Sequence, residues 1–394
     1  MIYLDHNATT PLLPEVAEAM AECSRRSFGN PASQHAAGRR ARRALEDARE
    51  GIAQLIGARL EGTPADQLIF TSGGTEANNL AMFGLAGQQP GHLIVSAIEH
   101  PSVIGPAEAL AKRGWQVDRL GVSPDGEVMV EQLSELLRPE TRLVAVMLGN
   151  NETGVLQPVE EIARRCQTAG VPVFTDAVQV AGKLPLDFHQ LGVAAMSIAA
   201  HKFHGPVGSG ALVVRAGVMI EPRLFGGFQQ AAARPGTESV ALAVGMHTAL
   251  AAWRREHNAQ LERMESLRGQ FERTLLAECP ELIVNGAAAA RLPHTSNITF
   301  PGVDGQAMVM ALDLAGVCCS TGSACASGSS EPSPTLLAMG LDKAAARSSL
   351  RFSFGVRTTP DEVAEAVREI LRIYRAGAGG RIQDSGFGIQ GSRA

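Results

Sequence analysis

Short apolar runs alternate with amphipathic stretches between residues 60 and 220. The runs HLIVSAI, TRLVAVML, VPVFTDA and GALVV have the length and the branched residues of buried strands. The stretch from Val159 to Ala169 has the spacing of an amphipathic helix and lies between two of these runs. Strands that are joined by crossover helices lie parallel in one sheet. The pattern therefore predicts an α/β fold with a mostly parallel central sheet in a large domain.

A different pattern follows in the second half of the chain. From about Ser239 to Ala277 the sequence predicts one long amphipathic helix, of the kind that bridges two domains. A strand-like SNITF, an apolar helix and a strand-like LRFSFG come next, and Thr359 and Pro360 suit the start of a last helix. These elements predict a smaller α+β domain. The predicted division is a large domain at residues 15–255, a small domain at residues 1–14 and 256–376, and a flexible tail at residues 377–394.

Composition narrows the range of partners. The chain has 394 residues, of which 45% are hydrophobic, so about two domains can each bury a core. Lys and Arg (35) nearly balance Asp and Glu (40), which argues against a polybasic face for nucleic acid or anionic lipid. Small molecules or proteins are the expected partners.

The location of the protein is predicted from what the sequence lacks. The N-terminal segment has no signal-peptide pattern, and no apolar stretch reaches the roughly 18 residues of a membrane span. The six cysteines are dispersed, without a C-x-x-C pair that would indicate a zinc or redox site. We therefore expect a cytoplasmic protein with reduced thiols and no metal site.

A Gly-Gly turn in LIFTSGGTEANNL follows a predicted strand and precedes a predicted helix. Gly73 and Gly74 allow main-chain N–H groups to approach an anion, and Thr75 adds a hydroxyl at the helix N-terminus. This arrangement is typical of a phosphate site. An ordinary βα turn with a threonine cap has the same residues, so the turn alone leaves both interpretations open.

Asp176 and Lys202 each follow a predicted strand. Asp176 ends the strand in VFTDAVQ, at the sheet edge where α/β proteins bind ligands, and its carboxylate would suit a protonated ring nitrogen. Lys202 follows the small-residue strand MSIAA, with His201 and His204 beside it, and a desolvated lysine amine can form a Schiff base. The alternatives are a strand-end cap or salt-bridge partner for Asp176 and an exposed loop lysine for Lys202.

Further candidates lie in other turns and strand ends. Cys325 lies in the Ser/Gly-rich GSACASG, where an exposed thiolate could reach a substrate, although many free cysteines are inert. Arg351 interrupts the strand LRFSFG and could hold a carboxylate or form a cross-strand ion pair. His100 ends another strand and could stack on a flat ring, move protons or cap a helix. Asn151 and Gln179 supply neutral hydrogen-bond groups suited to a phenolic oxygen.

Taken together, these segments resemble one enzyme family. In order along the chain they are YLDHNATTP, GNPASQHAAG, FTSGGTEANN, EHPSV, NNETGV, DAVQ, AHKFHGPVGSGAL, RPGTES, GSACASG and RFSFGVRTT, which span nearly the whole chain outside the tail. The series resembles the NifS/IscS-type cysteine desulfurases, in the aminotransferase class V group of fold-type I pyridoxal phosphate enzymes. The resemblance implies pyridoxal 5'-phosphate as the cofactor and a homodimer as the assembly.

The resemblance also implies roles for the candidate residues. Lys202 would carry the cofactor, Asp176 would hold its pyridine nitrogen, and His100 would stack on the ring and move protons. Asn151 and Gln179 would meet the ring oxygen. Four residues would hold the phosphate, the last of them reaching across from the other subunit: Gly74, Thr75, His201 and Thr237.

The implied reaction converts L-cysteine to L-alanine. Arg351, together with Asn151, would fix the substrate carboxylate, and the Cys325 thiolate would attack the substrate sulfur and keep it as a persulfide. The sulfur would then pass to an acceptor protein, either an iron–sulfur scaffold or a tRNA-thiolation protein.

Two segments depart from the family pattern, and three other functions compete. Ala199 stands where the family usually has a serine, so one phosphate hydrogen bond of about 1 kcal/mol is missing. The segment GGFQQAAARPGT lacks the usual Gln-Glu-Arg sequence.

A selenocysteine lyase or another class V enzyme would use the same lysine, aspartate and arginine without needing the Cys325 thiol. A non-catalytic scaffold that binds a sulfur-acceptor protein would be free to lose Lys202 or Cys325, and both are present.

Overall fold

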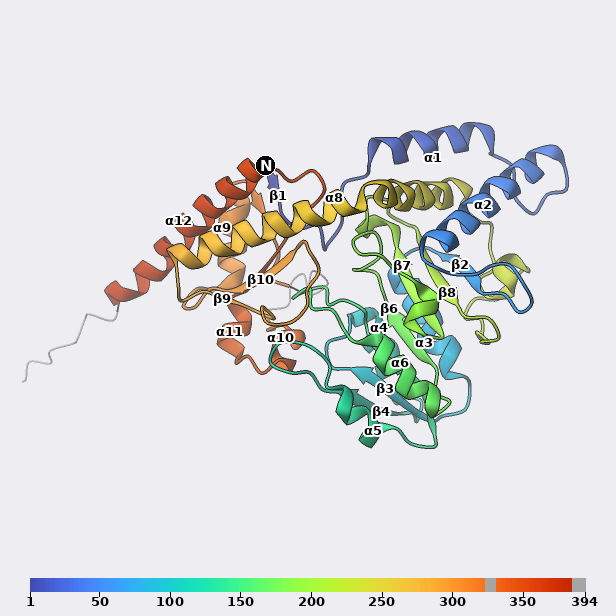
Figure 1. Ribbon diagram of the computed structural model, residues 1–394, viewed down its shortest axis with the longest axis horizontal. Coiled ribbons are helices and arrows are strands. Elements are labelled where there is room, and N and C mark those ends of the chain that lie inside the picture. Colours follow the sequence, from blue (N-terminus) through green and yellow to red (C-terminus); the bar gives the residue numbers. More distant parts are fainter. Residues whose placement is uncertain (323–330, 385–394) are drawn as a thin grey trace, which may run out of the picture.

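A seven-stranded sheet forms the centre of the larger part of the molecule (Figure 1). The computed structural model describes residues 1–322 and 331–384. The strand order is β2-β8-β7-β6-β5-β3-β4. Strand β8 runs antiparallel to β2 and β7, and the other neighbouring pairs are parallel. The prediction of a mostly parallel sheet is therefore confirmed. Its strands are β2 (Gln67–Thr71), β3 (His92–Ser96), β4 (Gln116–Leu120), β5 (Thr141–Ala145), β6 (Val173–Asp176), β7 (Ala195–Ala199) and β8 (Gly210–Val214).

Helices cover both faces of this sheet, as a mostly parallel sheet requires. On β5, Leu143 and Ala145 pack into the core under α3 and α4, whereas Val144 packs into the core on the opposite face with α6, α7 and the first half of α8. Successive strand residues point to opposite faces, so an uninterrupted apolar run fits this environment. The helices before α8 are α1 (Pro14–Arg26), α2 (Ala36–Leu55), α3 (Gly74–Ala86), α4 (Pro101–Ala111), α5 (Leu133–Leu136), α6 (Val159–Thr168) and α7 (Phe188–Leu191).

A second, smaller core is built from the two ends of the chain. Leu4 lies in it beside Phe271, Phe352 and Phe354, and the ring of Phe271 is 5.0 Å from that of Phe352 and 5.3 Å from that of Phe354. Its sheet has the order β12-β10-β9 and is antiparallel, while β1 pairs in parallel with β11. The elements are β1 (Ile2–Tyr3), β9 (Ile283–Val284), β10 (Thr295–Thr299), α9 (Gly305–Leu314), β11 (Val317–Cys318), α10 (Pro334–Ala338), α11 (Lys343–Arg347), β12 (Ser349–Ser353) and α12 (Pro360–Asp384).

One helix joins the two cores. Helix α8 (Val240–Glu278) is 39 residues long, and Figure 1 shows it running from α1 and α2 to α12. Met246 in its first half belongs to the larger core, whereas Leu267 and Leu275 in its second half belong to the smaller one. The long helix expected from about Ser239 to Ala277 is therefore confirmed.

The last helix begins where its sequence indicates. The Glu362 N–H donates to Thr359 Oγ1 (3.2 Å), and the Thr359 N–H donates to Glu362 Oε2 (2.8 Å), which is a reciprocal cap with Pro360 in the first turn. The helix continues to Asp384, beyond residue 376, after which the sequence predicts a tail. Cys325 lies outside the described residues. Among the helices of the described part of the chain, none is long and apolar enough to cross a membrane.

Candidate active site

A cavity of about 260 Å³ lies at the carboxyl edge of the central sheet. Its walls come mainly from the turns that follow β2, β3, β5, β6 and β7, which is where α/β sheets bind ligands. The predicted residues that line it are Gly74, Thr75, His100, Asn151, Asp176, Gln179, His201, Lys202 and Arg351. Thr237 is exposed and is not among the lining residues, and the predicted nucleophile lies outside the described part of the chain.

Lys202 reaches the cavity from a single 3₁₀ turn (Ala200–Lys202) that follows β7. Its Nζ donates to the main-chain oxygens of Asn7 (2.6 Å) and Ala8 (2.8 Å), so the N-terminal segment holds the amine at the cavity wall. The residue is half-buried, unlike an ordinary loop lysine. A partly desolvated amine with its direction fixed is suited to covalent chemistry with a carbonyl.

Asp176 is buried at the end of β6 and keeps both carboxylate oxygens occupied. Asn78 Nδ2 donates to Asp176 Oδ2 (2.6 Å), and the Val178 N–H donates to Asp176 Oδ1 (2.9 Å). The Asn78 side chain is itself fixed, because Ser197 Oγ donates to its Oδ1 (2.5 Å). These bonds fix the orientation of the carboxylate, as the partner of a cationic ring nitrogen requires.

His100 is connected to Asp176 through Asn78 and Ser102. The second hydrogen of Asn78 Nδ2 goes to Ser102 Oγ (2.8 Å), which lies 2.6 Å from His100 Nδ1. Because the Ser102 N–H also donates to His100 Nδ1 (3.1 Å), this nitrogen is an acceptor. Burial lowers the pKa of His100, the Asp176 carboxylate opposes this, and Lys202 adds to the lowering. A neutral ring with its proton on Nε2 follows. His100 also caps α4, so the capping alternative is confirmed.

The Gly-Gly turn places the first turn of α3 against the cavity. Helix α3 begins at Gly74, where a Cβ atom would lie 2.9 Å from Val178 Cγ2, so a side chain there would be crowded. The helix N-terminus offers main-chain N–H groups to an anion. His201 stands nearby with Nδ1 3.2 Å from Thr9 Oγ1, and burial lowers its pKa to about 4. It is therefore a neutral hydrogen-bond donor or acceptor at neutral pH.

Gln179 is oriented by groups that the sequence does not reveal. Its Nε2 donates to the Asn7 main-chain oxygen (3.1 Å), and Lys183 Nζ donates to its Oε1 (3.5 Å). Burial lowers the pKa of Lys183 to about 7, and the charges of Lys202 and Arg351 add to the decrease. The amide of Gln179 therefore presents a defined face to the cavity.

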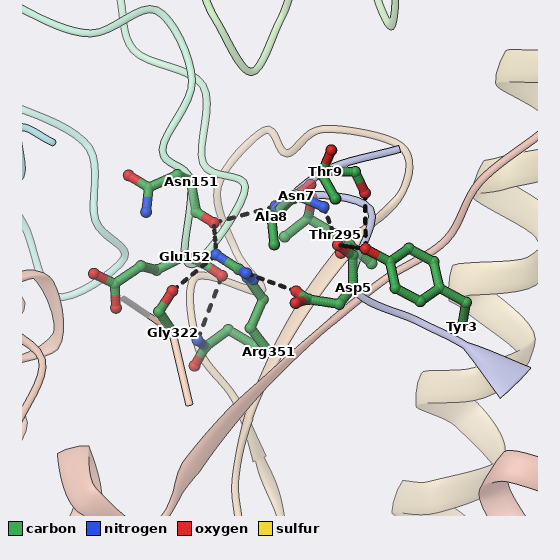
Figure 2. Close-up of polar contacts among 12 residues, drawn as sticks. Tyr3, Asp5, Asn7, Ala8, Thr9, Asn151, Glu152, Thr295, Gly322 and Arg351 are labelled. Carbon is green, nitrogen blue, oxygen red and sulfur yellow. Dashed lines mark hydrogen bonds and ion pairs between the residues drawn. The ribbon is translucent and has the colours of Figure 1, made fainter. Parts of the chain in front are cut away.

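Arg351 is 1% exposed on β12, an outer strand of the three-stranded sheet. Figure 2 shows its guanidinium enclosed by main-chain oxygens and one carboxylate. Nη1 donates to the oxygens of Asn151 (2.9 Å) and Gly322 (2.8 Å), and Nη2 is 2.7 Å from Asp5 Oδ1. An ion pair is present, but it links the arginine to the N-terminal segment rather than to a neighbouring strand of its sheet.

Several residues of the cavity carry no prediction from their local sequence. They are Asn7, Ala8, Asn78, Glu99, Ser102 and Glu152. Asn78 had a usable signal, because it lies one helical turn after Gly74 and so faces the same side of α3. Glu99, Ser102 and Glu152 lie within two positions of predicted residues. Asn7 and Ala8 reach the cavity only because chain folding brings a distant segment to it.

Glu99 supports a prediction about pH. Burial raises its pKa to about 8, with the Asp176 charge adding to the increase, although Ser96 Oγ (2.5 Å) and the Met147 N–H (2.7 Å) donate to Oε1. A carboxyl group with a raised pKa stays protonated in the fold while it ionises in the unfolded chain, so stability falls as pH rises between about 4.5 and 8. Between pH 6 and pH 8 the free energy of unfolding of the wild type should fall by about 2 kcal/mol because of Glu99. We expect Glu99→Gln to lack this decrease.

Thermal unfolding of the wild type and of Glu99→Gln at both pH values measures this effect. The glutamine keeps an acceptor for Ser96 and Met147, so the two proteins should be similar below about pH 4.5, where Glu99 is protonated in both the folded and the unfolded chain. Equal decreases in Tm for both proteins between pH 6 and pH 8 would contradict the prediction.

The family model for aminotransferase class V matches residues 2–365. The chain belongs to this family. It is 41% identical to cysteine desulfurase IscS of Dictyoglomus turgidum over 94% of both chains, and 37% identical to cysteine desulfurase NifS of Azotobacter vinelandii over 94% of this chain and 91% of that one. These relatives confirm the predicted kinship with NifS/IscS-type cysteine desulfurases.

The fold comparison agrees with the family assignment. A solved NifS-like protein from Rickettsia africae superimposes with a TM-score of 0.87 at 32% identity, covering 95% of this chain and 99% of that one. The predicted fold-type I architecture is confirmed. Aminotransferase class V enzymes of this kind depend on pyridoxal phosphate, which is the predicted cofactor, so the chain is a pyridoxal phosphate-dependent enzyme.

The cavity has groups that match the parts of this cofactor. Three groups border this one space: the Lys202 amine, the buried Asp176 carboxylate and the N-terminus of α3. The amine matches the aldehyde of the cofactor, the carboxylate matches its ring nitrogen, and the helix N-terminus matches its phosphate. Ala199 occupies the place of the serine expected from the family, and its methyl group packs beside Gly74 instead of offering a hydroxyl. The remaining groups fit the cofactor without it.

Proposed function

We propose that this enzyme removes the sulfur of L-cysteine, releases L-alanine and passes the sulfur through Cys325 to an acceptor protein. The observation that carries the proposal is the meeting of the Lys202 amine, the Asp176 carboxylate and the Arg351 guanidinium at one cavity. These groups suit an amino-acid substrate. Lys202 would hold the cofactor that takes up the substrate amine, Asp176 would hold the ring nitrogen through which the ring draws electrons from Cα, and Arg351 would bind the carboxylate. The NifS and IscS relatives support cysteine as the substrate.

The proposed division into domains accounts for where the cavity lies. Lys202 and Asp176 belong to the proposed large domain (15–255), whereas Asn7 and Arg351 belong to the proposed small domain (1–14 and 256–376). The substrate would therefore be held between them. Pockets between domains commonly serve this purpose.

The residues of the large domain would prepare the cofactor and move protons. Pyridoxal phosphate, when bound, supplies an aldehyde carbon that joins amines and a ring that withdraws electrons from Cα. Asp176, fixed by Asn78, would hold the proton of the ring nitrogen. Lys202 Nζ would hold the cofactor and, once released, move a proton at Cα. His100 would donate its Nε2 proton from the wall of the cavity.

Arg351 and Cys325 would act on the substrate itself. Arg351 would bind the carboxylate beside Asn151. The Cys325 thiolate would attack the substrate sulfur, so that a sulfur–sulfur bond forms while the bond between sulfur and Cβ breaks. The electron pair of the broken bond stays with the carbon fragment, which takes up a proton and leaves as alanine, and the persulfide stays on Cys325. An iron–sulfur scaffold or a tRNA-thiolation protein would receive this sulfur.

We further propose a cytoplasmic homodimer. Met219, Phe225 and Phe228 lie within ten positions of one another and are 84%, 87% and 93% exposed, which is unusual for large apolar side chains on a monomer. Thr237 is exposed close behind them in sequence, where it could reach the cavity of a second subunit. The free thiols of Cys23, Cys166, Cys279, Cys318 and Cys319 support a reducing compartment.

An assay on the purified protein tests the proposed reaction. With L-cysteine and a thiol reductant, but without any keto acid, we expect sulfide and alanine in equal amounts. A requirement for a keto acid would indicate a transaminase, and turnover of selenocysteine without turnover of cysteine would indicate a selenocysteine lyase. Absence of the visible absorbance of bound cofactor would favour the non-catalytic scaffold.

A further inference from the structure

The guanidinium of Arg351 already has a carboxylate partner from its own chain. Asp5 Oδ1 lies 2.7 Å from Nη2, in an ion pair whose side chains are 18% and 2% exposed for Asp5 and Arg351 (Figure 2). Nη1 is engaged by the main-chain oxygens of Asn151 and Gly322. A substrate carboxylate that binds Arg351 therefore meets a guanidinium whose charge is already compensated.

Main-chain bonds fix Asp5 independently of the arginine. Asp5 bridges in parallel to Ser353 on β12, two positions beyond Arg351. The Ser353 N–H donates to the Leu4 oxygen (2.8 Å), the His6 N–H donates to the Ser353 oxygen (3.4 Å), and the Tyr3 hydroxyl donates to the Asp5 oxygen (3.2 Å). The aspartate therefore remains beside Arg351 when another anion arrives.

Among the carboxylates described, Asp5 is the one that an ion pair joins to Arg351. The Glu152 carboxyl instead accepts a hydrogen bond from Ser333 Oγ (2.5 Å), and burial raises its pKa while the charge of Arg351 lowers it. Burial lowers the pKa of His294 and of Lys183, which reduces their positive charge. Among the residues described, Asp5 is thus the carboxylate that directly opposes the charge of Arg351.

We propose that Asp5 is a positioning residue that acts as the internal counter-ion of Arg351 and lowers the affinity of the site for amino-acid carboxylates. This role of Asp5 rests on the proposed function, in which Arg351 binds the substrate carboxylate. A like charge held near the carboxylate weakens its attraction to the guanidinium. Asp5 also compensates the buried arginine whenever no amino acid is present, which favours release of the product.

Binding of L-alanine and of L-alaninamide to the holoenzyme tests this proposal. The two ligands differ in the carboxylate, and the absorbance of the cofactor reports their binding. We expect Asp5→Asn, which keeps an acceptor for Nη2 but removes the charge, to bind L-alanine about tenfold more tightly and L-alaninamide unchanged. The KM of Asp5→Asn for L-cysteine should be lower than that of the wild type as well. Loss of a merely structural contact would weaken binding of both ligands.

Two further variants control for the loss of an aspartate. Asp118 pairs with Arg138 at 2.5 Å beside the central sheet, so Asp118→Asn removes an aspartate–arginine ion pair away from the cavity and should leave both affinities unchanged. Asp5→Glu keeps the charge and should bind L-alanine like the wild type. It also tests the proposal if Asp5→Asn fails to fold.

The outcomes separate this proposal from the function on which it rests. If wild type binds L-alaninamide as tightly as L-alanine, Arg351 is not the carboxylate site and both proposals are overturned. If wild type prefers L-alanine, but Asp5→Asn binds it no more tightly, the counter-ion role alone is overturned. An Asp5→Glu variant with a tenfold change in affinity also overturns it.

Discussion

Lys202→Ala is expected to abolish turnover of L-cysteine, with kcat/KM lower by about a thousandfold or more. The amine is held by the main-chain oxygens of Asn7 and Ala8 at the cavity wall, and no other lysine among the described residues lines that cavity. Without it the cofactor has no covalent attachment, and Cα loses its proton acceptor. The protein should still fold, because the side chain is only half-buried.

Turnover and cofactor attachment are measured separately for this variant. Borohydride reduction followed by mass analysis detects covalent cofactor, which we expect in the wild type and not in Lys202→Ala. Lys183→Met is the matched control, because Lys183 lies behind Gln179 and contacts it rather than lining the cavity. It should keep the covalent attachment. Covalent cofactor on Lys202→Ala would contradict the assignment of this lysine.

Cys325→Ala is expected to lower sulfide release from L-cysteine by about a hundredfold or more while leaving the cofactor absorbance and L-alanine affinity unchanged. The Cys325 thiolate is proposed to take the sulfur directly, and the methyl side chain of the variant cannot attack the substrate sulfur. Selenocysteine turnover should persist, because selenium leaves more easily than sulfur and needs no thiol. Sulfide, alanine and protein-bound persulfide are the quantities to measure.

Cys319→Ala serves as the matched control for this prediction. Burial raises the pKa of Cys319 far above its usual range, so its thiol stays protonated and unreactive. We expect this variant to retain activity on L-cysteine. Full activity of Cys325→Ala on cysteine would show that sulfur leaves without a protein nucleophile and would overturn the proposed mechanism.

The elements of the fold were largely predictable because their patterns are local. The run GALVV becomes β8, and the apolar spacing from Val159 to Ala169 becomes α6. A short apolar run carries no information about its direction, however, so the antiparallel orientation of β8 depends on pairing with β7 and β2. The end of α12 at Asp384 likewise extends past the predicted start of the tail.

The candidate site was predictable where a residue type and a strand end coincide. Asp176 and Lys202 each follow an apolar strand, and parallel strands bring their carboxyl ends to one edge. The positioning groups were not predictable in this way. Asn78 donates to Asp176 across 98 positions of sequence, and Asp5 reaches Arg351 across 346.

By itself, the sequence determined the family, the cofactor and the mostly parallel sheet, and it predicted the residues of the candidate site, because apolar periodicity and contiguous motifs are properties of short segments. Only the tertiary structure decided which groups hold those residues in place. Asn7 lines the cavity and Asp5 contacts Arg351 because the N-terminal segment pairs with β12, and that pairing depends on how distant segments pack. The ionisation of Glu99 and Lys183 was decided in the same way, since burial is a property of the folded chain.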